Sequence, residues 1–260
     1  MFLRGCEISA VPSGLRRLTG LRRLFLGANP LDSVPEWIGD FAALDALDLS
    51  EVRLRSVPAG TWRLGSLAML DLAHNEIAEI SDDVGRLEKL RYLYVSDNAL
   101  TSLPETIGGL RELRYLGAAD QAGRRLRHLP DPAGGLERLE ELRLQGNALT
   151  SLPESIGRMR RLRELHLDGN DLASLPESLG NLAELRELRL RGNRIERLPD
   201  SAARLGRLSV LDLRNNRLAA WPRVIADLPR LEKLDLRWND VDESDPVVER
   251  LEARGCRVLL

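Results

Sequence analysis

The segment LEELRLQGNALTSLPESIGRMRR, residues 139–161, is followed without a gap by two further copies of the same pattern. These copies are LRELHLDGNDLASLPESLGNLAE (162–184) and LRELRLRGNRIERLPDSAARLGR (185–207). The pattern has a period of 23 residues and reads LxxLxLxxNxLxxLPxxIGxLxx. Repetition at a fixed period of this length predicts a solenoid, in which each unit buries its apolar side against the next.

The repeat extends over nearly the whole chain, because its asparagine position recurs ten times with two substitutions. The residues at this position are Asn29, Val52, Asn75, Asn98, Gln121, Asn147, Asn170, Asn193, Asn216 and Asn239. We therefore predict a single domain over residues 1–260. It has a partial first repeat in 1–20, ten repeats in 21–241 and a C-terminal cap in 242–260.

The repeat resembles that of the leucine-rich repeat family, whose consensus carries Asn or Cys at this position. Its LPxxIGxL tail is similar to the 23-residue class of bacterial leucine-rich repeat proteins, plant Ras-group-related proteins and Scribble-type scaffolds. The resemblance implies an α/β solenoid in the form of an arc. A parallel sheet lines the concave face of such an arc, and short helical segments line the convex face. Because this family binds very diverse ligands, the resemblance alone does not identify a partner.

The residues of the repeat favour the same architecture. The two leucines of LxL alternate with other residues, as in a strand with one buried face, and the spacing after LP suits a helical turn. The asparagines are expected to form a ladder that satisfies backbone groups where each strand ends. We therefore assign structural roles to the consensus leucines, asparagines and prolines.

The two ends of the chain differ from the repeat. The segment DPVVERLEARGCRVLL (245–260) predicts a capping helix that begins at Asp245 and Pro246, ends at Gly255 and is followed by a short strand. Residues 1–4 predict an open edge strand, which implies either a homodimer through this edge or a longer natural product.

Composition argues against several classes of function. The 40 acidic and 38 basic residues nearly cancel, which argues against a nucleic-acid partner. The sequence contains no apolar segment long enough to predict a signal peptide or a membrane span. Cys6 and Cys256 lie at opposite ends, which predicts free thiols and a cytoplasmic protein. The Arg and Ala content favours a bacterial source.

One surface carries the candidate binding residues. If LxxLxLxxN numbers positions 1 to 9, positions 3, 5 and 7 point away from the core, with position 8 beside them; we call this surface the open sheet face. Tyr92, Tyr94 and Tyr115, the only tyrosines, all fall on it in two adjacent repeats. Such clustering is typical of a binding hot spot rather than of general strand preference. The other candidates around the tyrosines are Phe25, Asp48, Met69, Asp71, His74, Asp97, Gly117 and Asp120.

Repeats six to ten carry charged residues on the same face. Glu141, Glu164 and Glu187 form one column, flanked by arginines. Two interpretations stay open: a solvated ion-pair lattice, or a polar recognition surface. In the second interpretation Arg143, His166 and Arg189 contact the partner. Trp238, at position 8 of the last repeat, is expected either to contact the partner or to pack under the C-terminal cap.

The fifth repeat breaks the pattern in GAADQAGRRLRHLP, residues 117–130, where three extra residues lengthen the unit to 26. Gly117 is expected to leave a gap in the open sheet face. Gly123, Arg124 and Arg125 are expected to form a bulge on the loop beside it. We interpret the break as part of the binding site, with a neutral surface insertion as the alternative.

No catalytic or metal site is predicted, because His74, His128 and His166 lie in different repeats. His74 lies near two aspartates but lacks an activated nucleophile. We therefore predict a non-catalytic scaffold that binds a protein or peptide and has no cofactor, no nucleic acid and no membrane contact. The alternatives are a small-molecule pocket or atypical enzyme at the irregular fifth repeat, and a host-directed bacterial effector that acts by binding.

Overall fold

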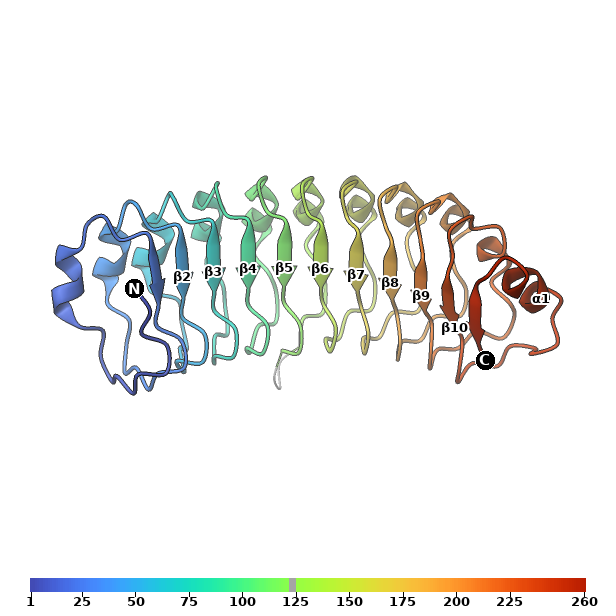
Figure 1. Cartoon of the computed structure of the whole chain (residues 1–260), viewed down its shortest axis with the longest axis horizontal. Coiled ribbons are helices and arrows are strands. Elements are labelled where there is room, and N and C mark those ends of the chain that lie inside the picture. Colours follow the sequence, from blue (N-terminus) through green and yellow to red (C-terminus); the bar gives the residue numbers. More distant parts are fainter. Residues whose placement is uncertain (122–124) are drawn as a thin grey trace. The chain divides into compact units, whose positions relative to one another are not determined.

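The structure is a computed structural model that describes residues 1–121 and 125–260. The chain divides into two compact units, Met1–Leu126 and Arg127–Leu260, and each is described by itself. In both units, parallel strands of three residues form one layer and short 3-10 helices form the other (Figure 1). The α/β repeat architecture expected from the sequence is confirmed. The single-domain organisation stays a prediction.

In the first unit each strand pairs in parallel with the strand of the next repeat, for example Leu24 with Leu47. Its elements are η1 (Ser13–Arg17), β1 (Arg23–Phe25), η2 (Glu36–Asp40), β2 (Ala46–Asp48), η3 (Ala59–Arg63), β3 (Met69–Asp71), η4 (Asp82–Arg86), β4 (Tyr92–Tyr94), η5 (Glu105–Gly109) and β5 (Tyr115–Gly117).

The second unit repeats this arrangement, again with strands paired in parallel. Its elements are η6 (Asp131–Gly135), β6 (Glu141–Arg143), η7 (Glu154–Arg158), β7 (Glu164–His166), η8 (Glu177–Asn181), β8 (Glu187–Arg189), η9 (Asp200–Arg204), β9 (Val210–Asp212), η10 (Arg223–Ile225), β10 (Lys233–Asp235), α1 (Val247–Glu252) and β11 (Arg257–Leu259).

The core lies between the strand layer and the 3-10 layer. The central leucine of each strand from β1 to β10 is buried, as Leu47, Leu93 and Leu165 illustrate, and the apolar residue two positions later is buried with it. Full burial of such a side chain contributes about 1.5–3 kcal/mol. The residues on either side of the central leucine therefore point away from the core, onto the open sheet face.

The 3-10 helices begin where the LP proline of the repeat stands. Pro104 precedes η5, and its carbonyl accepts the first i to i+3 bond from the Ile107 amide at 3.1 Å. Proline suits this position because its φ is already restricted and its missing N–H is not needed there. Where Ser81 replaces the proline, its Oγ accepts the Asp83 amide instead.

The asparagine ladder forms as expected. Asn98 Nδ2 donates to the carbonyls of Leu72 and Val95 at 2.9 and 3.1 Å, and its Oδ1 accepts the Ile77 amide at 3.0 Å. Gln121 replaces the asparagine in the fifth repeat without breaking this pattern. Its Nε2 donates to the Val95 carbonyl, and its Oε1 accepts the Leu100 amide at 3.1 Å.

The C-terminal segment caps the core as the sequence predicts. Asp245 accepts the Val247 amide at 2.9 Å, α1 follows, and Gly255 ends the turn with a φ of +85° before β11. At the other end, residues 1–4 extend along β1, since the Leu3 amide donates to the Phe25 carbonyl at 2.8 Å. Among the described residues no helix is long and apolar enough to cross a membrane.

Candidate functional site

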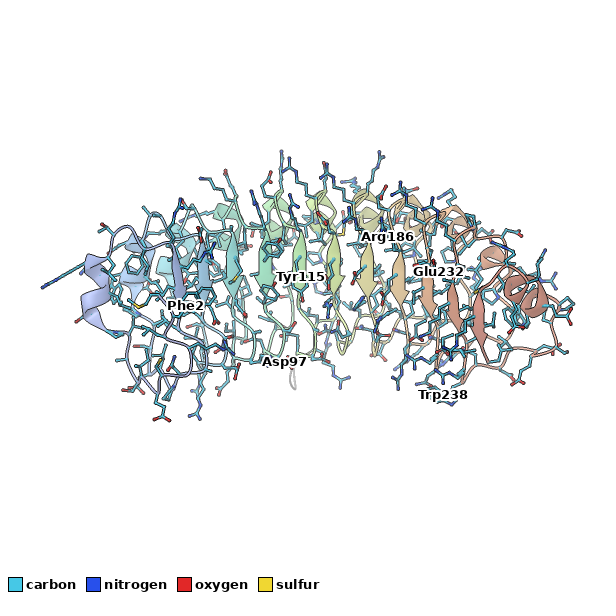
Figure 2. The ribbon with its side chains drawn as sticks, viewed as in Figure 1. Phe2, Asp97, Tyr115, Arg186, Glu232 and Trp238 are labelled. Carbon is cyan, nitrogen blue, oxygen red and sulfur yellow. The ribbon has the colours of Figure 1, made fainter. Side chains whose placement is uncertain are left out.

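Tyr92, Tyr94 and Tyr115 form one cluster on the open sheet face of the first unit, here called the tyrosine cluster. Tyr92 pairs in register with Tyr115, and Tyr94 with Gly117. The rings of Tyr94 and Tyr115 are 4.6 Å apart between centroids, with their planes inclined by 34°. Tyr92 is 40% exposed, while the other two side chains are half-buried. The side chain of Tyr115 stands over the strand layer near the centre of Figure 2.

The gap expected at Gly117 is absent, because Tyr115 fills it. A Cβ atom at Gly117 would lie 2.8 Å from Tyr115 Oη and 3.0 Å from Tyr115 Cε1. Gly117 is therefore the place where the Tyr115 ring folds back onto the sheet. Because the Tyr115 ring occupies the space above Gly117, a small-molecule pocket directly above this glycine is disfavoured. The absence of a side chain at Gly117 allows the ring to pack there.

The apolar candidates of the first unit separate into two places. Met69 is half-buried and pairs in register with Tyr92, so it borders the tyrosine cluster. Phe25 instead stacks on Phe2, with ring centroids 4.7 Å apart and planes within 9°. Strand β2 lies between β1 and β3, so Phe25 is not next to Met69.

Asp48 does not belong to an exposed acidic rim, which corrects the prediction from the repeat columns. Its side chain is buried because Arg4 covers it: Arg4 Nη1 donates to Asp48 Oδ2 at 3.0 Å and to Ser50 Oγ at 2.7 Å. Gly27 provides the space, since a Cβ atom there would lie 2.3 Å from Arg4 Nη1. The column alignment missed Arg4 because it lies in the partial first repeat.

The remaining acidic candidates form a row where strands β3 to β5 end, here called the acidic row: Asp71, Asp97 and Asp120. Asp97 lies beside His74, with Oδ2 3.4 Å from His74 Nδ1. Burial raises the pKa of Asp71, although its carboxylate accepts the Ala73 amide. Burial and the charge of Asp97 together raise the pKa of Asp120. The row therefore concentrates negative charge beside the tyrosine cluster.

Position 8 of the repeat adopts a left-handed backbone throughout. Gly146, Gly169 and Gly192 occupy it in the second unit, as expected for turn glycines. In the first unit the same position has φ values of +56° at His74, +52° at Asp97 and +51° at Asp120. Left-handed backbone costs an L-residue about 1–2 kcal/mol, and somewhat less for Asp. The first unit thus has side chains at this position in each full repeat, whereas the second unit has three glycines together with Asn215 and Trp238.

The basic bulge predicted in the fifth repeat is only partly described. Arg125 is exposed. Gly123 and Arg124 lie outside the described residues, so their place in a binding site stays a prediction.

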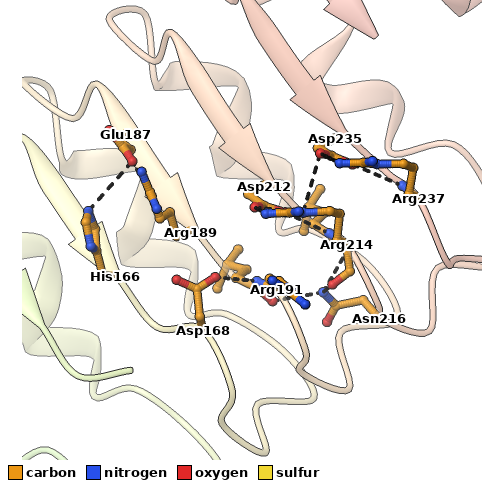
Figure 3. Close-up of polar contacts among 12 residues, drawn as sticks. His166, Asp168, Glu187, Arg189, Arg191, Asp212, Arg214, Asn216, Asp235 and Arg237 are labelled. Carbon is orange, nitrogen blue, oxygen red and sulfur yellow. Dashed lines mark hydrogen bonds and ion pairs between the residues drawn. The ribbon is translucent and has the colours of Figure 1, made fainter. Parts of the chain in front are cut away.

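In the second unit the charged columns form ion pairs. Arg143 Nε pairs with Glu141 Oε1, and Arg189 Nε pairs with Glu187 Oε1. Farther along, Arg214 bonds Asp212, and Arg237 Nη2 donates to Asp235 Oδ2 at 2.7 Å (Figure 3). Asp235 is only 1% exposed, so this lattice is more buried than the solvated one considered from the sequence.

His166 is buried, which corrects its prediction as an exposed contact residue. It is 7% exposed and lies between Arg143 and Arg189 in the strand register. Burial lowers the pKa of His166, and the two neighbouring guanidinium groups lower it further. Its ring is therefore neutral near pH 7.

Trp238 does not pack under the C-terminal cap. It is 63% exposed and has a φ of +62°. The guanidinium carbons of Arg191 and Arg237 lie 5.9 and 5.7 Å from its ring centroid, within the range of cation–π interactions. The repeat pattern places Trp238 at position 8. Its exposure and its contacts with the two arginines become known only from the structure.

The serines nearest to His74 are held by other bonds. Ser50 Oγ donates to Asp48 Oδ1 at 2.7 Å, and Ser96 Oγ accepts the Ala119 amide at 3.1 Å. The arrangement therefore favours recognition of a ligand over nucleophilic chemistry at this edge.

Comparison with known families agrees with the repeat. The model of a leucine-rich repeat region matches residues 107–187 and 153–253, and a second leucine-rich repeat model matches residues 65–120. No protein of curated function matches the sequence.

Solved structures with the same fold come from bacteria and plants. A leucine-rich repeat protein of Leptospira interrogans is 21% identical over all of this chain and 95% of its own, with a TM-score of 0.65. The ectodomain of the receptor kinase GASSHO1/SCHENGEN3 from Arabidopsis thaliana, in complex with CASPARIAN STRIP INTEGRITY FACTOR 2, is 29% identical over 96% of this chain, with a TM-score of 0.82. The plant peptide hormone receptor RGFR1, in complex with RGF2, is 26% identical over 92% of this chain, with a TM-score of 0.54. This chain spans 31% of the GASSHO1 chain and 47% of the RGFR1 chain.

Proposed function

Because this chain belongs to the leucine-rich repeat family, we propose that it binds a protein or peptide through the open sheet face of its first unit. The contact is centred on the tyrosine cluster and includes the acidic row. The observation that carries the proposal is the packed pair of Tyr94 and Tyr115 beside the more exposed Tyr92.

The tyrosine cluster has the properties of a binding hot spot. Tyrosine offers a large apolar area with few rotatable bonds and keeps a hydroxyl for hydrogen bonding. The contact between Tyr94 and Tyr115, and the position of Tyr115 over Gly117, hold the rings in place before a partner arrives. Such preorganisation reduces the entropy lost on binding.

The backbone of the acidic row gives independent support. Asp97 and Asp120 of this row, with the adjacent His74, hold the left-handed conformation of position 8, at which three repeats of the second unit have glycine while Asn215 and Trp238 keep side chains. Residues with strained backbone cluster at functional sites, where the surrounding structure holds them in place. Side chains at these positions lie outside the core, which leaves them available for recognition.

The charge of the acidic row indicates the chemistry of the partner. Asp97 and Asp120 raise the negative potential beside three aromatic rings. A lysine or arginine side chain would satisfy both features, since it pairs with carboxylates and stacks on tyrosine rings. We therefore propose a partner segment with basic side chains. The same charge disfavours a nucleic-acid phosphate backbone.

Solved relatives support peptide or protein binding as the general function. RGFR1 is described as a plant peptide hormone receptor in complex with RGF2, and the GASSHO1 ectodomain is in complex with CASPARIAN STRIP INTEGRITY FACTOR 2. Both exceed 25% identity to this chain. Neither the identity of the partner nor the face used by this chain follows from them.

The experiment is a quantitative pull-down from a lysate of the source organism, with three baits compared by mass spectrometry. The baits are the wild type, a triple variant with Tyr92→Ala, Tyr94→Ala and Tyr115→Ala, and Trp238→Ala. The third bait is a matched control, because it removes an exposed aromatic side chain from the second unit.

We expect the wild type and Trp238→Ala to recover the same partner and the triple variant to lose it. Truncation of a hot-spot residue costs about 2 kcal/mol or more, so the triple variant should bind at least about 30-fold more weakly. Circular dichroism checks that each bait is folded. Equal recovery by the wild type and the triple variant would contradict the proposal, as would loss with Trp238→Ala alone.

A further inference from the structure

Three glutamates stand directly opposite one another in the second unit. Glu141 on β6 pairs in register with Glu164 on β7, and Glu164 pairs with Glu187 on β8. Like charges in such positions destabilise a sheet. Burial and the charges of Glu141 and Glu187 raise the pKa of Glu164, which reflects this repulsion. The column therefore needs positive charge nearby.

The neighbouring column forms direct ion pairs with only two of the three glutamates, although both of its arginines also partly offset the raised pKa of Glu164. Arg143 pairs with Glu141, and Arg189 pairs with Glu187. Between these arginines the register places His166, and no ion pair joins Glu164 to an arginine in the described part of the chain. Three carboxylates therefore lie in one column with two guanidinium groups beside them, and the side chain between these two is an imidazole.

The imidazole of His166 points into this group with an unsatisfied nitrogen. Its side chain is 9% exposed, and Nε2 has no hydrogen-bond partner among the described residues. Nε2 lies 3.6 Å from Glu164 Oε2 and 3.8 Å from Glu187 Oε1, and Figure 3 shows His166 directed toward Glu187. A buried polar atom without a partner costs about 1–3 kcal/mol.

We propose that Glu164, His166 and Glu187 bind a divalent transition-metal ion of the zinc type. One ligand atom from each of the three residues lies within 4.8 Å of the other two. Ligands at about 2.1 Å from a tetrahedral zinc ion are about 3.4 Å apart, so small side-chain rotations bring the three atoms into range.

The donor set selects the class of metal. A neutral imidazole nitrogen with two carboxylate oxygens suits zinc and neighbouring transition metals, whereas calcium and magnesium prefer oxygen ligands alone. The Glu187 oxygen nearest to His166, Oε1, is also the one that Arg189 contacts, so a bound metal would share this oxygen with Arg189 or take the second oxygen of the carboxylate.

Such a metal would offset the repulsion among the carboxylates and satisfy the His166 nitrogen. Three protein ligands leave at least one coordination position for water or for a group of a bound partner. The site lies in the second unit and does not depend on the tyrosine cluster.

The test uses the full chain, freed of metal with a chelator and titrated with ZnCl2 by isothermal titration calorimetry. We expect one zinc ion per chain for the wild type. Both His166→Ala and Glu164→Gln should bind at least about tenfold more weakly, since loss of even an outer-shell partner costs this much. The side chain of Glu164 is 43% exposed, so Glu164→Gln keeps the test valid if His166→Ala fails to fold.

Two controls distinguish this site from other zinc-binding groups. His74→Gln removes the histidine that lies beside Asp97, and Cys6→Ser removes the exposed thiol. Both should bind zinc as the wild type does. With Co2+ in place of zinc, visible bands without a near-ultraviolet thiolate band are expected. The proposal is overturned if the wild type does not bind, if His166→Ala and Glu164→Gln bind unchanged, or if Cys6→Ser abolishes binding.

Discussion

Two glycines should lose different amounts of stability on the same substitution, because different atoms face them. A Cβ atom at Gly117 would meet the end of the Tyr115 ring, with Oη at 2.8 Å. This ring can rotate away. A Cβ atom at Gly157 in η7 would lie 2.5 Å from the carbonyl oxygen of Ser178 and 2.7 Å from its Cβ. Ser178 belongs to the next repeat and cannot move without shifting that repeat.

The expected magnitudes follow from these contacts. Gly117→Ala reduces the freedom of the unfolded chain, which stabilises the fold by about 0.4–1 kcal/mol. It also disturbs the pair of Tyr94 and Tyr115, which contributes about 0.5–1.5 kcal/mol. The free energy of unfolding should therefore change by less than about 1 kcal/mol. Gly157→Ala overpacks the contact between two repeats and should cost about 1–3 kcal/mol.

Urea denaturation followed by far-ultraviolet circular dichroism measures both changes. Gly65→Ala serves as the control, because no heavy atom of the described residues beyond its own chain neighbours lies within 4 Å of the added methyl group. Gly134→Ala should behave like Gly157→Ala, since its Cβ would lie 2.6 Å from the Ser155 carbonyl oxygen. Partner binding adds a second readout, in which only Gly117→Ala should weaken capture. If Gly117→Ala lowered stability more than Gly157→Ala, the assignment of rigid and movable neighbours would be wrong.

Two further predictions concern the repeat and the ion pairs. Asn98→Ala should lower the free energy of unfolding by about 2–3 kcal/mol in urea titrations, because it leaves the buried Ile77 amide without its acceptor. Asn98→Gln should lower the free energy of unfolding by less than half of this amount, since Gln121 makes equivalent hydrogen bonds in the fifth repeat. Burial opposes the ionised form of Asp212, but hydrogen bonds from Arg214 outweigh burial and lower the pKa of Asp212 below its ordinary 3.8. The ion pair of Asp212 and Arg214 therefore stabilises the fold above pH 3.8, and this stabilisation is lost as the pH falls through the lowered pKa. Arg214→Gln should therefore cost about 1–2 kcal/mol at pH 7; a difference from the wild type that stays constant down to pH 2 would contradict this reasoning.

Much of the fold was predictable because one pattern of residues recurs in every repeat. A leucine at each central strand position buries one face, so the residues beside it must point to the open sheet face. That rule placed Tyr92, Tyr94 and Tyr115 on one surface without any coordinates. The asparagine ladder was predictable for the same reason, since each asparagine meets the same backbone groups of its neighbours.

The contacts made by individual side chains were not predictable from the alignment of equivalent repeat positions in columns. Asp48 and Asp71 occupy the same column, yet Arg4 from the partial first repeat covers only Asp48. His166 was placed on the exposed face, but the long side chains in the adjacent strands bury it. The columns do place Glu164 and Glu187 beside His166, so comparison of adjacent columns would have found this group.

The sequence by itself determined the repeat, its parallel strands and the face on which the tyrosines lie, because these depend on a period of 23 residues and on the two-residue alternation of a strand. Only the tertiary structure decided that Tyr115 covers Gly117, that Asp48 is buried and that the nitrogen of His166 faces two carboxylates. The physical reason is that the backbone path follows from a pattern shared by all repeats. The direction of each side chain follows instead from the volumes and charges of the few residues packed against it.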